Sequence, residues 1–335
     1  MLLSVDALHA LGRKVFVAGG VPDEVAVAVT DALVLAELDG IPSHGFSRIP
    51  FYVDQARSGK VDARAEAVLH MAAPSLVLMD AACNFAFPAI ERGLAEALPL
   101  CQRYGVVMVG VRRSHHCGVL GHFAEKMARQ GVICLAFANT PAAMAPWGGA
   151  KATFGTNPLA LGCPREPDPL VVDMSLSTVA RGKIMNAGQK GESIPEGWAL
   201  DADGQPTTDA RKALQGTMLP FGGAKGAALA LMVEILAATL PGARHAYEAS
   251  SFFEAEGEAP GTGQSFLLVD CVRFNPGFAD RLEALVGHML AQEGVRLPGE
   301  RRFRQREERR RTGVELPDAL WQDLCRRAEG APRPV

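Results

Sequence analysis

The sequence lacks several features that would assign it to a class at once. No run approaches the roughly 20 apolar residues of a membrane span, and the first segment has no cationic start of the kind that opens a signal peptide. The seven cysteines are scattered and include no C-x-x-C pair, which argues against a disulfide framework and a zinc site. We therefore expect a cytoplasmic protein with reduced thiols and no membrane partner.

A strong charge of one sign and the common nucleotide-binding fingerprints are also missing. The net charge of −3 is wrong for a dedicated nucleic-acid binder. Neither G-x-x-x-x-G-K-[ST] nor G-x-G-x-x-G occurs, and the absence of G-x-S-x-G weakens a serine-hydrolase interpretation. Of the 335 residues 48% are apolar, so a large core is expected, and this length predicts two domains because one core rarely serves more than ~250–300 residues.

The apolar pattern predicts an α/β protein with helices at both ends of the chain. The first 60 residues show helical spacing, and the pattern returns near residue 277 and again in a short helix from Pro317. Short β-rich runs alternate with helical stretches between these ends. The runs lie at 75–80, 105–111, 132–138, 169–174 and 265–270, and the helical stretches at 86–103, 119–130 and 226–240. We predict an α/β domain at 75–276 and a helical domain built from 1–74 and 277–335.

Two adjacent histidines, His115 and His116, follow a predicted strand and precede a predicted helix. The dipole of that helix would disfavour an imidazolium at His116 and lower its pKa. Such tuning suits a group that gives and takes a proton near neutral pH. The alternatives are a loop histidine with satisfied hydrogen bonds and a metal ligand. The metal alternative is the weakest, because neither the spacing to His122 nor a neighbouring carboxylate completes a ligand set.

A second polar cluster follows Pro42, which prevents the preceding helix from continuing. Ser43, His44 and Arg48 lie within one or two turns and can converge on one site. Arg48 could bind a carboxylate through its guanidinium fork, and Ser43 with His44 could form a hydroxyl–imidazole pair. The alternative is a helix-capping serine with a surface arginine.

Two further segments could bind phosphate. The glycines of 221–226 open an apolar helix and flank Lys225. A glycine-rich turn at a helix N-terminus can bind a phosphate, although such glycines can also allow close helix packing. Within that helix Glu234 stands alone and needs a partner. The arginine-rich run at 300–311 is typical of a solvated face, and the alternatives are a grip on a phosphate or, less well supported, nucleic-acid binding.

Seven short motifs occur in order along the chain: SHG-x-SR-x-P-x-Y at 43–52, SHH-x-G at 114–118, FGTNP at 154–158, VVDMS at 171–175, ARGK at 180–183, SIPEGWALD at 193–201 and FGG-x-KG at 221–226. Taken together, these motifs resemble the malate/L-lactate dehydrogenase family of the non-Rossmann type. That family includes ureidoglycolate dehydrogenases, sulfolactate dehydrogenases and cyclic ketimine reductases. The resemblance runs from about residue 5 to 325 and explains why no G-x-G-x-x-G is present. It implies a homodimeric NAD(P)-dependent oxidoreductase with its own cofactor-binding fold.

The resemblance also implies a role for each matching residue. His116 matches the histidine that passes a proton to or from the substrate, and Ser43 and His44 match the pair that supports it. Arg48 and Thr156 match substrate-binding positions. The matching cofactor contacts are Thr140, Asp173, Met174, Ser175 and Lys225, with Arg301 and Arg302 where the adenosine end is expected. No metal is implied.

One departure from the family pattern bears on the substrate. Cyclic ketimine reductases are expected to carry an acid after the ARG tripeptide, whereas this chain has Lys183, as in the hydroxy-acid branch. We therefore favour a 2-hydroxy or 2-oxo acid of the malate, lactate or sulfolactate type. The alternative is reduction of piperideine-2-carboxylate or pyrroline-2-carboxylate.

Arg301 and Arg302 would suit a 2′-phosphate, which favours NADP over NAD. A metal-dependent hydrolase or lyase and a non-catalytic nucleic-acid binder remain as rival classes.

Overall fold

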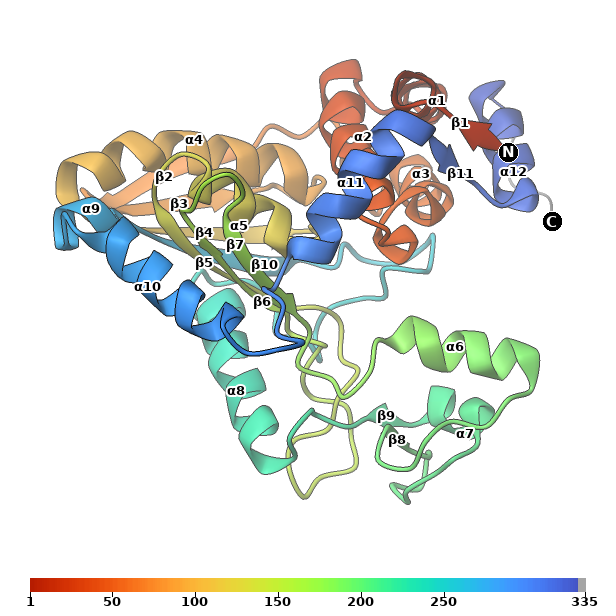
Figure 1. Cartoon of the computed structure of the whole chain (residues 1–335). Coiled ribbons are helices and arrows are strands. Elements are labelled where there is room, and N and C mark those ends of the chain that lie inside the picture. Colours follow the sequence, from red (N-terminus) through yellow and green to blue (C-terminus); the bar gives the residue numbers. More distant parts are fainter. Residues whose placement is uncertain (331–335) are drawn as a thin grey trace.

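A computed structural model describes residues 1–330 and shows a seven-stranded mixed sheet with helices on both faces (Figure 1). The strand order is β2-β3-β4-β10-β5-β6-β7. Within this sheet β3 and β4 pair in parallel, and the other neighbours are antiparallel. The strands are β2 (Val68–Ala73), β3 (Leu76–Asp80), β4 (Val106–Ser114), β5 (Ile133–Ala138), β6 (Leu159–Cys163), β7 (Leu170–Met174) and β10 (Thr262–Val269). The α/β class predicted from the sequence is confirmed.

Alternating side chains along the strands decide which helices cover each face. Val107, Val109 and Val111 of β4 are buried, and Val109 meets α4 (Ala86–Tyr104) beside Gly93. On the same face α5 (Leu120–Ala128) packs on β5 and β6. The opposite face carries α8 (Ala224–Glu234), which continues as a π-helical turn at Ile235–Thr239, and then α9 (Cys271–Phe274) and α10 (Phe278–Leu290) (Figure 1). The loop that bears His116 follows β4, an interior strand of this sheet.

Helices from the two ends of the chain pack together beside this sheet (Figure 1). Ser4 caps the first of them through the amide of Ala7, and strand β1 (Leu2–Leu3) pairs with β11 (Val314–Glu315). The five helices are α1 (Val5–Ala18), α2 (Asp23–Leu38), α3 (Ile49–Ser58), α11 (Glu300–Thr312) and α12 (Asp318–Ala328). One hydrophobic core runs from this unit into the sheet, so the boundaries at 74/75 and 276/277 stay a prediction.

A smaller lobe with its own hydrophobic cluster lies beyond the sheet (Figure 1). It contains α6 (Arg181–Lys190), β8 (Ala199–Leu200), α7 (Ala210–Gln215) and β9 (Thr217–Met218). Met144 and Ile184 are fully buried in the cluster, which also draws on α8. Among the helices of residues 1–330, none combines the length and apolar character needed to cross a membrane.

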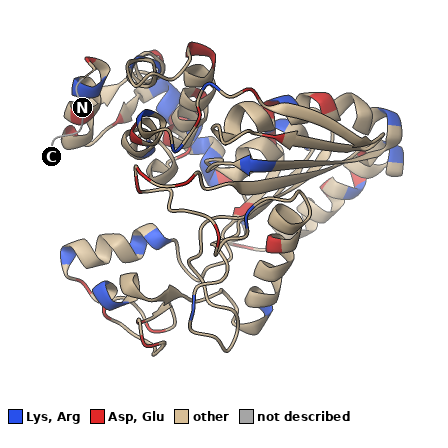
Figure 2. Ribbon diagram, turned by 180° about the vertical axis from the view of Figure 1, so that it is seen from behind, with Lys and Arg blue, Asp and Glu red and all other residues tan. Residues whose placement is uncertain are grey.

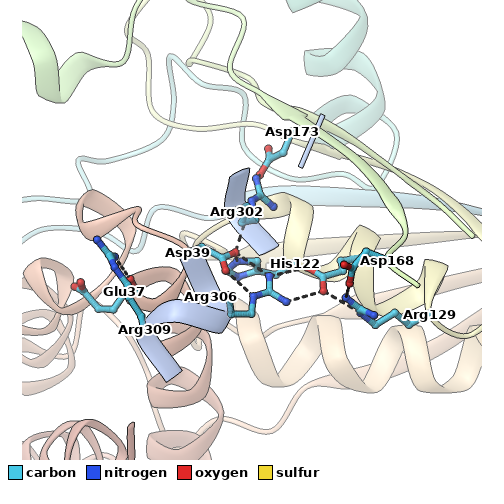
Figure 3. Close-up of polar contacts among 10 residues, drawn as sticks. Glu37, Asp39, His122, Arg129, Asp168, Asp173, Arg302, Arg306 and Arg309 are labelled. Atoms are coloured by element: carbon cyan, nitrogen blue, oxygen red, sulfur yellow. Dashed lines mark hydrogen bonds and ion pairs between the residues drawn. The ribbon is translucent and has the colours of Figure 1, made fainter. Parts of the chain in front are cut away.

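One face of α11 is solvated, as expected from the sequence, with Arg301, Arg304, Arg310 and Arg311 exposed. The opposite face forms a buried junction around Arg306 that the sequence did not indicate. Arg306 is only 7% exposed and donates to Asp39 Oδ1 at 2.6 Å and to Glu125 Oε1 at 2.7 Å (Figure 3). His122 shares Asp39, with 2.8 Å between Nε2 and Oδ2. Burial opposes the charge of Arg306, but the hydrogen bonds to both carboxylates outweigh it and raise its pKa. Figure 2 shows the cations of this region beside Asp and Glu residues of neighbouring elements.

The junction joins three parts of the chain that lie far apart in the sequence. Asp39 ends α2, Glu125 belongs to α5, and Arg306 comes from α11. Because the segment that follows Asp39 carries Ser43, His44 and Arg48, and the loop before α5 carries His116, the ion pairs fix these two segments relative to each other. The sequence could not indicate this link between the two segments, because the link depends on which face of α11 is buried.

We predict that Arg306→Met destabilises the protein by about 3–5 kcal/mol, because it leaves Asp39 and Glu125 buried without their cation. Denaturant unfolding would measure the change. Arg310→Met is the matched control: its side chain is exposed on the same helix, and exposed substitutions usually change stability by less than about 0.5 kcal/mol. Equal effects of the two substitutions would contradict the role assigned to the junction.

Candidate active site

The site forms where the segment between α2 and α3 meets the loop that follows β4. Pro42 starts a 3-10 turn, η1 (Pro42–His44), and a second turn, η2 (Phe46–Arg48), leads into α3. The chain passes so close to α2 that a Cβ at Gly45 would lie 2.3 Å from Glu37 Oε1, which accepts the amide of Phe46 at 2.7 Å. Only glycine fits there, so these contacts dictate the path of the segment that carries Ser43, His44 and Arg48.

The structure brings the predicted catalytic residues together. The rings of His44 and His116 are 5.3 Å apart between centroids, and Ser43 Oγ is 3.0 Å from His44 Nδ1. Arg48 donates through Nε to the carbonyl of Ser43 at 2.6 Å, and its guanidinium lies 4.7 Å from the ring centroid of Phe253. Its Nη1 is buried and has no hydrogen-bond partner among the described residues. A buried guanidinium donor without a partner is suited to an incoming anion.

Tyr52 belongs to the site, although the sequence analysis assigned it no role. Its hydroxyl is 2.5 Å from His116 Nδ1, and burial raises its pKa, so the phenol stays protonated. Tyr52 follows Arg48 by four residues, the spacing that puts two side chains on one helical face. That spacing within the motif at 43–52 was the signal that could have identified it.

His115, unlike His116, is held by Gln55. Its Nε2 is 2.8 Å from Gln55 Oε1, and the Gln55 amide donates to the carbonyl of Phe252 at 3.0 Å. The Phe252 ring packs on both histidines, 5.1 Å from His115 and 5.2 Å from His116 between centroids. Phe252 and Phe253 come from a loop about 200 residues after Gln55, and no local pattern marked them.

Burial is the main reason why the histidines of the site are neutral. It lowers the pKa of His116 well below its ordinary value, with further lowering by Arg48, His44 and His115. The pKa of His115 falls to about 3 for the same first reason, and that of His44 is also lowered. The helix predicted to follow His116 is present, with α5 beginning at Leu120, but burial is the largest cause of the lowered pKa. The direction of the shift was right, but its origin is desolvation.

The two predicted threonines meet at the ends of β5 and β6. The amide of Thr156 donates to Thr140 Oγ1 at 2.9 Å, and their hydroxyls are 3.4 Å apart. Behind them Glu234 has the partners that its position in an apolar helix required. Its carboxylate accepts from the side-chain amide of Asn157 at 2.7 Å and from that of Asn139 at 3.2 Å. The residues beside both threonines are therefore anchored in α8.

A third group of predicted residues gathers at the start of α5. Asp173, at the end of β7, accepts from the amide of Gly121 at 3.0 Å and from Arg302 Nη2 at 3.3 Å (Figure 3). Arg302 Nη1 is buried and has no hydrogen-bond partner in the described part of the chain. Met174 and Ser175 follow Asp173 directly. Lys225 and Arg301 are exposed, and no hydrogen bond or ion pair joins either side chain to this group within residues 1–330.

Comparisons with known proteins cover nearly the whole chain. The family model described as malate/L-lactate dehydrogenase matches residues 3–325. The (2R)-3-sulfolactate dehydrogenase (NADP(+)) of Chromohalobacter salexigens is 51% identical over 96% of this chain and 97% of that protein. A Delta(1)-pyrroline-2-carboxylate/Delta(1)-piperideine-2-carboxylate reductase of Pseudomonas putida is 37% identical over 95% and 94%.

Solved structures give the same result for the fold. The piperideine-2-carboxylate reductase of Pseudomonas syringae superposes with a TM-score of 0.92 at 35% identity, over 99% of this chain and all of that one (100%). The sulfolactate dehydrogenase of Methanocaldococcus jannaschii superposes with a TM-score of 0.90 at 31% identity, over 98% and 97%.

The charges around His116 predict that binding of a small carboxylate takes up a proton. The cation of Arg48 helps to lower the pKa of His116, so an anion bound to Arg48 offsets that effect and raises the pKa. The complex then holds a proton at a pH where the free protein has lost it, and affinity for the anion rises as pH falls. Calorimetric titration with oxamate in two buffers of different ionisation enthalpy would measure the uptake. His116→Gln should bind oxamate without it, and pH-independent binding by the unmodified protein would contradict the prediction.

Proposed function

Because the chain belongs to the malate/L-lactate dehydrogenase family and is a nicotinamide-dependent oxidoreductase, we propose that it interconverts small 2-oxo and 2-hydroxy acids with NADP, dianionic acids such as 3-sulfolactate foremost. The observation that carries the proposal is the 51% identity, over 96% of this chain, to a (2R)-3-sulfolactate dehydrogenase (NADP(+)). The arrangement of Arg48, Tyr52 and His116 is consistent with it, since Arg48 offers a free hydrogen-bond donor for an anion beside the desolvated imidazole of His116.

In this proposal each residue of the histidine cluster has one task. Arg48 Nη1 binds the carboxylate, and Thr156 contributes a further substrate contact. His116 delivers a proton from Nε2 to the substrate oxygen, while its Nδ1–H donates to the Tyr52 hydroxyl. Ser43 and His44 support the imidazole from the other side. The proton and the hydride together turn the 2-oxo group into a 2-hydroxy group.

The group around Asp173 suits the cofactor because Arg302 keeps a buried donor without a partner, although its guanidinium also holds Asp173. Lys225 and Arg301 are exposed cations of the kind that bind phosphate. When bound, NADP supplies or accepts the hydride. We propose that it is held by Thr140, Asp173, Met174, Ser175, Lys225, Arg301 and Arg302.

The second candidate is reduction of cyclic imino acids, which the 37% identity to a pyrroline- and piperideine-2-carboxylate reductase supports. A cyclic imine presents the same carboxylate to Arg48 but no second anion. We propose that Lys183 distinguishes the two candidates. It is exposed in the first turn of α6, at the cationic start of that helix visible in Figure 2. A cation there favours the dianionic acids.

We propose that the protein is a homodimer whose partner covers the outer face of α8. This helix is apolar all round, a pattern typical of a buried helix. Yet its Leu231 and Met232 are 48% and 56% exposed in the single chain, and Leu240, just beyond it, is 60% exposed. A second copy would remove this surface from water. A solution mass equal to one chain of 35.5 kDa would contradict the proposal.

Two further expectations accompany the proposed activity. We propose a cytoplasmic location, since all seven cysteines are free thiols, as a reducing compartment would keep them. We also propose chemistry that needs no metal, which exhaustive chelation tests: loss of turnover would revive a metal-dependent mechanism. Fractionation of the producing cell tests the location.

We predict that 3-sulfopyruvate and oxaloacetate are reduced with higher kcat/KM than Delta(1)-piperideine-2-carboxylate, and that NADPH serves better than NADH. Nicotinamide absorbance, followed for each acid with each cofactor, measures both preferences. Lys183→Met should lose more on the dianions than on pyruvate, which serves as the monoanionic control. A tenfold preference for the cyclic imine, about 1.4 kcal/mol in the transition state, would replace the main proposal with the second candidate.

A further inference from the structure

The strand that delivers His116 to the site contains one extra residue. Between β4 and β10, Val111 is paired with Gln264 and Ser114 with Thr262, so the two residues Arg112 and Arg113 stand opposite Gly263 alone. This is a β-bulge, a feature that bends a strand and re-aims the side chains beyond it. Arg113 has φ +50°, in the left-handed region that a residue with a side chain rarely adopts.

The hydrogen bonds between β4 and the segment that follows β3 accommodate the extra residue. In a regular strand successive carbonyls point to opposite neighbours. Here the carbonyls of Arg112 and Arg113 both accept from the β3 side, from the amides of Ala81 at 2.9 Å and Cys83 at 2.8 Å. Both guanidinium groups also reach Asp80 Oδ2, each at 3.3 Å. Ala82 and Cys83, with φ of +51° and +64°, curve the β3 side around the bulge.

Buried side chains take over the backbone pairing beyond the bulge. The carbonyl of Ser114 accepts from Thr262 Oγ1 at 3.4 Å, and that of His115 accepts from Gln264 Nε2 at 3.1 Å. Thr262 and Gln264 are 0% and 1% exposed, so these donors form part of a rigid interior. The chain therefore leaves β4 along one defined path, and His115 and His116 are its next two residues.

The bulge shifts the alternation of side chains by one residue. Val107, Val109 and Val111 are buried on the α4 face, and a regular strand would place residue 113 there next. Instead the Arg113 side chain is 56% exposed, and Ser114, 1% exposed, continues the buried pattern. A one-residue slip reverses which face each later side chain meets.

We propose that the left-handed backbone at Arg113 is a positioning device for the proposed reaction, setting where His116 lies against Tyr52. The conformation of residue 113 carries this role, and its guanidinium group does not. The inference rests on the proposed role of His116, but the bulge and its contacts are independent of the substrate.

Three substitutions separate the backbone from the side chain. Arg113→Val introduces a β-branched residue, which disfavours φ +50°, whereas Arg113→Gly removes the same guanidinium but accepts that conformation freely. Arg112→Val is the matched control, because Arg112 also contacts Asp80 Oδ2 at 3.3 Å and is not among the residues with positive φ. Arg113→Val should lower kcat about tenfold or more, as small misplacements of a reacting group do, while the NADPH dissociation constant changes less than twofold. Arg113→Gly and Arg112→Val should keep at least half of kcat.

A second readout does not depend on turnover. In protein labelled with ¹⁵N-histidine, the Nδ1 resonance of His116, assigned by its loss in His116→Gln, reports the hydrogen bond to Tyr52. It should move in Arg113→Val and stay in Arg112→Val. If Arg113→Val does not fold, the smaller β-branched variant Arg113→Thr replaces it and should likewise show a lower kcat than Arg113→Gly and a shifted resonance. Equal kcat and an unmoved resonance in the 113 variants, or equal losses in Arg112→Val and Arg113→Val, would overturn the proposal. Absence of turnover by the unmodified protein would instead refute the proposed function and leave the resonance test intact.

Discussion

The buried ion pairs of Arg306 are the constraint on which the site depends. They tie Asp39 at the end of α2 to Glu125 in α5, and so hold together the two segments that carry Arg48 and His116 (Figure 3). Such a cluster is costly to desolvate and strongly destabilising to break, so loss of one member would destabilise the arrangement of these segments. The helices from both chain ends thus position the segments that carry the proposed catalytic residues.

Desolvation governs the site itself. It keeps His116 neutral in the free protein, and Arg48 reinforces the effect, so we predict that protonation of the imidazole is coupled to the binding of an anion. The aromatic wall of Tyr52 and Phe252 excludes water from both histidines. The bulge at Arg113 then fixes the direction of the chain as it enters this wall. Burial and the charge of Arg48 therefore set the pKa of the His116 imidazole, and the backbone of the bulge sets its position.

Local patterns predicted the elements well and the contacts between them poorly. The run at 105–111 became β4 (Val106–Ser114), because alternating valines over a buried face leave little ambiguity. The short LALGC of β6 (Leu159–Cys163) went unnoticed, since it has no β-branched residue. Ser43, His44 and Arg48 could be grouped because they are close in sequence. The convergence of His116 with them came from the family resemblance, and the loop of Phe252 and the buried face of α11 depend on tertiary packing that no local signal reports.

The central claim is that His116 carries the proton of the proposed reaction, and kinetics of two neighbouring variants test it most directly. His116→Ala should lower kcat by about 10²–10⁴, the usual effect of removing a positioned acid, with little change in NADPH binding. His115→Ala, which removes an equally buried ring that pairs with Gln55, should lower it far less. Near-normal turnover by His116→Ala, or an equal loss in the two variants, would contradict the account.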